Sequence, residues 1–151
     1  MEFEERLERG DISERMFEEK CKQEGIICVN TKLFINWNDN FDLLYGDYFI
    51  FLINPIYRDF KIDVKGGSVT KRSIDNFKGD YYVIYENSNG SAKTALVFNS
   101  RFLKDLINKP NFKFDEMLSH DRGIFYSRLY QIKNNAIELN EFINRLKVAN
   151  R

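Results

Sequence analysis

The stretch "GDYFIFLINPIYRDFKIDVKGG" (46–67) places the strongest constraint on how this chain folds. Residues 47–53 form a near-continuous apolar run, which is typical of a strand covered on both faces. Asn54 and Pro55 interrupt this run, and residues 58–65 then alternate strictly between apolar and charged side chains. The stretch therefore predicts a β-hairpin in which one strand is buried and the other presents a charged face.

The rest of the chain predicts helices on either side of further strands. Residues 10–25 are expected to form a helix that Asp11 caps, with Glu14 completing a capping box and Gly25 ending it. Further expected elements are a strand at 26–30, a hairpin of 81–87 and 93–99 around "SNGS", a short helical turn at 72–77, and helices at 101–108 (capped by Ser100) and 136–148. Residues 110–135 give no clear pattern. This order predicts one domain over 1–151, a mixed α/β or α+β fold with helices flanking a sheet.

Composition narrows the class of protein. Hydrophobic residues make up 43% and aromatic residues 15% of the chain, which predicts a folded protein. No apolar run reaches the roughly 20 residues of a membrane span, and the acidic N-terminus lacks the apolar core of a secretory signal. The two cysteines, Cys21 and Cys28, are not arranged as a zinc site. We therefore expect a cytoplasmic protein without a membrane partner.

The hairpin also carries residues suited to metal chemistry. Asp63 and Lys65 lie on one face of a strand, with Cβ atoms about 6–7 Å apart from the rise per residue. Asp47 begins the partner strand and offers a second carboxylate, and Mg²⁺ commonly binds through one or two carboxylates. The simpler interpretation is a solvated face with a weak ion pair. Against it, an unpaired carboxylate at the start of an apolar strand is costly when buried, and two glycines follow Lys65.

Three motifs together resemble a known family. "GDISE" (10–14) places a glutamate on a helix, "GDYF" (46–49) places an aspartate at a strand start, and "IDVKGG" (62–67) supplies Asp-x-Lys. This combination resembles the PD-(D/E)xK nuclease superfamily, in particular its small Holliday-junction-resolvase-like and homing-endonuclease-like members. The resemblance covers roughly residues 10–100. Gly46 stands where a proline would complete the motif.

The resemblance implies a role for each matching residue. Asp47 and Asp63 are expected to bind Mg²⁺, for which Mn²⁺ can substitute, and Val64 is expected to add its backbone carbonyl. Lys65 is expected to orient or activate the attacking water and to offset charge in the transition state. Glu14 is expected to reach the metal through water or to hold a second ion, with Glu18 as the alternative. The implied fold is restriction-endonuclease-like, a mixed central sheet flanked by helices.

The resemblance also implies a metal-dependent endonuclease that hydrolyses DNA, with RNA left open as a substrate, and that works as a homodimer. The alternative is a catalytically inactive domain on the same scaffold that binds nucleic acid or protein, and the zero net charge keeps it open. Lys71 and Arg72 are candidate phosphate contacts, with ordinary surface charge as the simpler interpretation. Asp42 competes with Asp47 for the metal. His120 lies in an expected loop and is not assigned a role.

Overall fold

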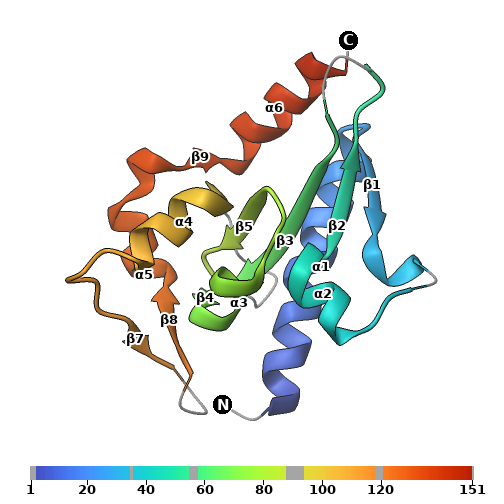
Figure 1. Ribbon diagram of the computed structural model, residues 1–151. Helices are drawn as coiled ribbons and strands as arrows, with labels where there is room; N and C mark the ends of the chain where they lie inside the picture. Colours follow the sequence, from blue (N-terminus) through green and yellow to red (C-terminus); the bar gives the residue numbers. More distant parts are fainter. Residues whose placement is uncertain (1–2, 35, 55–57, 88–93, 118–120, 151) are drawn as a thin grey trace.

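The chain forms an α+β structure built on two β-sheets (Figure 1). The computed structural model describes residues 3–34, 36–54, 58–87, 94–117 and 121–150, with the backbone alone for 3–11. The α-helices are α1 (Phe3–Gln23), α2 (Asp39–Tyr45), α3 (Lys71–Asn76), α4 (Ser100–Ile107), α5 (Tyr126–Gln131) and α6 (Leu139–Ala149). Two short 3₁₀ turns are η1 (Thr31–Leu33) and η3 (Lys133–Asn135).

The larger sheet has six strands and is mixed. In spatial order these are β1 (Ile27–Asn30), β2 (Tyr48–Phe51), β3 (Phe60–Gly66), β5 (Tyr81–Tyr85), β6 (Ala95–Asn99) and β9 (Ile137–Glu138). Only β3 and β5 run parallel, and the other neighbours are antiparallel. A three-stranded sheet orders β4 (Ser68–Thr70), β8 (Arg122–Phe125) and β7 (Asp115–Glu116). The expected mixed sheet with flanking helices is confirmed.

The two faces of the larger sheet carry separate hydrophobic cores. Side chains of α1 and α6, among them Phe17 and Phe142, cover one face, where they pack against Ile62 and Val64 of β3. The opposite face packs against α3, α4, α5 and the small sheet, with Tyr82 of β5 in its centre. Since successive side chains of a strand alternate between faces, Asp63 and Lys65 point to the second face, which is also covered.

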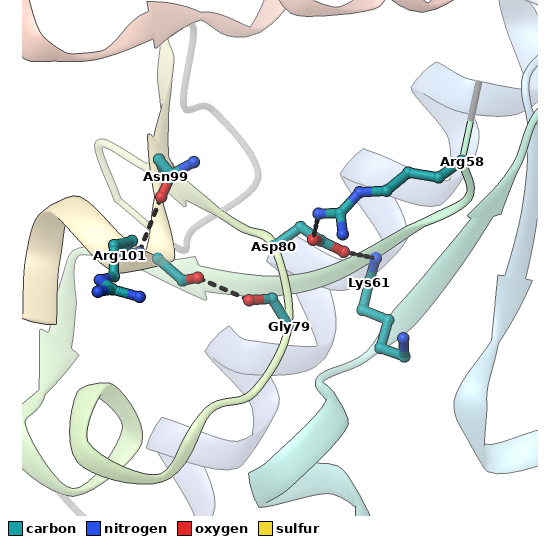
Figure 2. A network of polar contacts seen from close by, with 7 residues as sticks. Arg58, Lys61, Gly79, Asp80, Asn99 and Arg101 are labelled. Carbon is teal, nitrogen blue, oxygen red and sulfur yellow. Dashed lines mark hydrogen bonds and ion pairs between the residues drawn. The ribbon is translucent and has the colours of Figure 1, made fainter. Parts of the chain in front are cut away.

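A polar network holds the starts of β3, β5 and α4 together (Figure 2). The carboxylate of Asp80, just before β5, accepts a hydrogen bond from the backbone N–H of Lys61 (2.8 Å) and pairs with Arg58. The backbone N–H of Asp80 donates to the carbonyl of Lys61 (2.9 Å). Ser100 completes the network, because its hydroxyl donates to the carbonyl of Gly79 (2.6 Å). These bonds fix the alignment of the parallel pair β3–β5, on which Asp63 and Lys65 are placed.

The helix ends differ from the sequence prediction. Because α1 already begins at Phe3, Asp11 lies inside the helix, and its predicted role as N-cap is wrong. Gly25 follows the helix at a φ of +71°, as expected of a glycine that ends a helix. The cap of α4 is Asn99 and not Ser100, since the Asn99 side chain accepts a hydrogen bond from the backbone N–H of Arg101 (Figure 2).

The hairpin of β2 and β3 is confirmed, with Tyr48 opposite Ile62. β2 is shorter than expected, and its side chains alternate between buried and half-buried positions, so the prediction of burial on both faces is wrong. β5 and β6 pair as predicted, but the "SNGS" turn between them and His120 lie outside the described residues. None of the described helices is both long and apolar enough to cross a bilayer.

Candidate functional site

Asp47 is the best anchored of the residues named from the sequence. It follows α2 and Gly46, and only 7% of its surface is exposed. Its Oδ2 accepts a hydrogen bond from the backbone N–H of Val64 (2.8 Å), and its own N–H donates to the carbonyl of Ile62 (2.9 Å). Its carbonyl accepts from the N–H of Thr31 (2.9 Å). Asp47 is therefore tied on both sides, to β3 and to the segment after β1.

Asp63 and Lys65 form an ion pair on the covered face of β3. Asp63 Oδ2 lies 3.1 Å from Lys65 Nζ, with 6% of the Asp63 side chain and 34% of the Lys65 side chain exposed. Burial alone would lower the pKa of Lys65, but the nearby carboxylates of Asp63 and Asp47 outweigh it and raise that pKa. The carboxylates thus favour the charged form of Lys65 in the metal-free protein, which fits an electrostatic role.

The carboxyl groups of Asp47, Asp63 and Glu14 converge. Burial, then the charges of Asp63 and Glu14, raise the pKa of Asp47 well above its usual value, and the Glu14 carboxyl lies within hydrogen-bond reach of Asp47. The carboxylate of Glu18 instead accepts a hydrogen bond from the Tyr48 hydroxyl (2.9 Å). The geometry thus selects Glu14, and not Glu18, as the α1 carboxylate at this site.

Asp42 of α2 is a fourth carboxyl group in the same place. Burial, then the charge of Asp63, raise its pKa, while Asp47 within hydrogen-bond reach lowers it. Its Oδ1 is buried and has no hydrogen-bond partner. The sequence analysis set Asp42 against Asp47 as rivals, whereas the structure brings both to the site. The spacing of five residues did not predict that both side chains reach one site, because a helix end and a glycine turn lie between Asp42 and Asp47.

Tyr82 is a further neighbour of Asp63, and Ser73 contacts Tyr82; the sequence analysis singled out neither residue. Tyr82 is directly opposite Asp63 in the β3–β5 pairing and is fully buried. Its hydroxyl shares a hydrogen bond of 2.8 Å with the Ser73 hydroxyl of α3. Burial, then the charge of Asp63, raise the pKa of Tyr82, so its hydroxyl keeps its proton. The hydrogen bond between Tyr82 and Ser73 holds a polar, uncharged side chain opposite Asp63.

The other candidates lie at the edge of this cluster or beyond it. Val64 donates its backbone N–H to Asp47, and a role for its carbonyl in metal binding stays a prediction. Lys71, at the start of α3, forms an ion pair with Asp75, whereas Arg72 is exposed. Gly67 adopts a φ of +80° with open space around its Cα, so a turn conformation explains this glycine.

The donor chemistry of the cluster fits a divalent cation. Carboxylate oxygens are the ligands that Mg²⁺ prefers. A cation would relieve the repulsion that, after burial, raises the pKa values of Asp42 and Asp47. The unpartnered Oδ1 of Asp42 supplies a free donor atom. Within the described ranges, however, no three acidic, histidine or cysteine side chains are already arranged around a metal-sized space. Binding therefore requires the carboxylates to reorient.

Asp47→Asn is expected to stabilise the protein in the presence of EDTA. Asparagine keeps an oxygen for the Val64 N–H but removes the buried charge. Because the native state raises the pKa of Asp47 above its usual 3.8, ionisation costs stability as the pH rises above that value. The gain should therefore be small at pH 4 and reach about 1–3 kcal/mol near pH 7.

Urea unfolding of the two proteins at both pH values measures this difference, with exposed Asp105→Asn on α4 as the control. A variant less stable than the wild type at pH 7 would contradict the inferred repulsion.

Comparison with known proteins adds no assignment: no protein-family model, curated protein or solved structure matches the chain.

Proposed function

We propose that this protein is a metal-dependent nuclease that hydrolyses phosphodiester bonds of DNA, with its centre at the start of β2 and the middle of β3. The observation that carries the proposal is the convergence of four carboxyl groups, one of which pairs with the ammonium of Lys65. They come from α1 (Glu14), α2 (Asp42), the residue before β2 (Asp47) and β3 (Asp63). A merely solvated charged face does not explain why Asp47 and Asp63 are both buried. Burying several repelling carboxylates lowers stability and is typical of functional sites.

The residues divide into two roles. Asp47 and Asp63 are proposed to hold Mg²⁺ or Mn²⁺, with Glu14 and the Val64 carbonyl completing the shell and Asp42 as an added donor. Such a cation supplies positive charge beside a phosphate and lowers the pKa of water. The charged Lys65 orients a water and offsets the charge that develops on the phosphate oxygens.

The proposal agrees with the resemblance to the PD-(D/E)xK superfamily. In the fold, a glutamate-bearing helix comes first and a hairpin then delivers Asp47 and Asp-x-Lys, which is the order of the three motifs. We extend the proposal to a restriction-endonuclease-like scaffold acting as a homodimer, because one metal centre in each chain cuts one strand.

A second candidate function is a non-catalytic domain on this scaffold that binds nucleic acid or protein. It is favoured by one observation: in the part of the chain that the structure describes, no metal-ligand group is already assembled. The ion pair of Asp63 with Lys65 would then be a structural contact that neutralises Asp63. The two functions differ in whether the protein turns over a substrate.

Wild-type protein is expected to cut supercoiled plasmid or a four-way DNA junction with Mg²⁺ or Mn²⁺ and to be inactive in EDTA. Agarose and denaturing gels measure the products, and a structured RNA tested in parallel defines the substrate class. Cutting that persists in EDTA would contradict metal dependence. Binding of any of these substrates without cutting under all metal conditions would favour the non-catalytic function.

A further inference from the structure

A second polar feature lies at α3, on the side that contacts β8. A shallow hollow of about 340 Å³ opens where the first turn of α3 meets the start of β8. Its lining includes Lys71, Arg72 and Arg122, together with Asp75 and Asp121. Arg122 belongs to a part of the sequence without a readable pattern, and the pairing of β8 with β4 brings it beside α3.

The charges in this hollow are unequally paired. Lys71 is engaged by Asp75 one turn along the helix. Arg72 and Arg122 are both exposed, and neither forms an ion pair with another described residue. Two guanidinium groups that have no ion-pair partner in the described part of the chain and line one concave surface suit an anion with several oxygens, because each guanidinium can donate two parallel hydrogen bonds. A phosphate group is such an anion.

Helix α3 connects the hollow to the proposed catalytic centre. It contacts α2 on one side and β8 on the other (Figure 1). Ser73, which follows Arg72 in α3, shares a hydrogen bond of 2.8 Å between its hydroxyl and that of Tyr82, the residue paired with Asp63. The lining of the hollow and the β5 residue opposite Asp63 are therefore joined through one short helix.

We propose that this hollow binds a backbone phosphate of the nucleic-acid strand, flanking the bond that is cut at Asp47 and Asp63. The proposal rests on the proposed nuclease function and adds a binding site to it. Arg72 and Arg122 hold the phosphate, and Asp121 opposes it. Backbone contacts of this kind position a strand without reading its sequence.

The test is binding of a fluorescein-labelled DNA junction in EDTA, followed by anisotropy over a series of salt concentrations. Arg72→Ala/Arg122→Ala is expected to weaken binding by about tenfold and to reduce the slope of log K against log salt by about 1, the loss of one phosphate contact. Asp121→Asn is expected to strengthen binding by about two- to threefold, because it removes the opposing charge.

The matched control is Arg145→Ala/Lys147→Ala. This variant also removes two positive charges, but on α6, which covers the opposite face of the sheet. It is expected to change binding by less than about twofold. Equal losses in the two double variants would overturn the proposal, since net charge alone would then explain binding. Inorganic phosphate and unlabelled DNA are then compared as competitors. If phosphate displaced the labelled DNA at as low a concentration as unlabelled DNA does, the proposal that the hollow binds a nucleic-acid strand would also be overturned.

This outcome is separable from that of the nuclease itself. Selective weakening by Arg72→Ala/Arg122→Ala in a protein that cuts nothing would support the hollow and contradict the nuclease. Metal-dependent cutting with an unchanged KM and unchanged binding in this variant would support the nuclease and overturn the hollow.

Discussion

Asp63→Asn is expected to lower the rate of metal-dependent cleavage by about 10²–10³-fold or more, and Lys65→Met by a similar factor. Asp63→Asn removes a charged metal ligand, and Lys65→Met removes the cation that offsets charge on the phosphate. Lys65→Arg should keep part of the activity, because arginine keeps the charge but not the shape of the ammonium. Plasmid nicking rates under single-turnover conditions measure all three.

The two substitutions differ in their effect on the fold, and this must be separated from the effect on catalysis. In Asp63→Asn, the side chain of Lys65 is one third exposed and can turn to water. In Lys65→Met, the buried carboxylate of Asp63 loses its partner, which is the more costly change. Urea unfolding identifies any loss of folded protein, and Asp63→Asn is the cleaner test of the chemistry.

The controls are Asp105→Asn and Lys104→Met, which make the same changes on α4, away from the cluster. Both are expected to cut at the wild-type rate. Equal cutting by all variants would identify a contaminating nuclease, and full activity of Asp63→Asn alone would contradict the assignment of Asp63 as a metal ligand.

The hairpin could be predicted because its information is local. Alternation over 58–65 is a period-two pattern, and it placed Ile62 and Val64 correctly in the core. The same pattern placed Asp63 on a charged face, for which exposure to solvent was the simpler interpretation, whereas Asp63 is buried. Periodicity separates the two faces of a strand but does not say which of them is covered. Here α3 and the small sheet cover the second face.

The elements that were missed depend on contacts that are distant in sequence. The sequence analysis predicted no helix after Asn38, but the Asn38 side chain accepts a hydrogen bond from the backbone N–H of Phe41 and caps α2. β8 is four residues long and pairs with β4, more than fifty positions earlier. Neither short element has a pattern of its own. As a result, Asp42 was not recognised as a partner of Asp47, and Arg122 was not recognised at all.

Gly46 is the residue on which the position of Asp47 depends most, and Gly46→Ala is expected to destabilise the protein by about 2–4 kcal/mol. Gly46 has φ +81° and ψ −166°, a conformation that is essentially restricted to glycine. An added Cβ would lie 2.6 Å from the carbonyl oxygen of Ile62 and 2.9 Å from the ring of Phe77. Urea unfolding measures the loss, and the control is Gly25→Ala.

Gly25 separates the two causes of this loss. It also has a positive φ, +71°, but an added Cβ there would meet no atom within 4 Å, so Gly25→Ala should cost only about 1 kcal/mol. In Gly46→Ala, the carbonyl that must move is the one that accepts the N–H of Asp47. Cleavage by the folded fraction should therefore fall as well. Equal costs for the two variants would mean that close packing at Gly46 does not hold Asp47 in place.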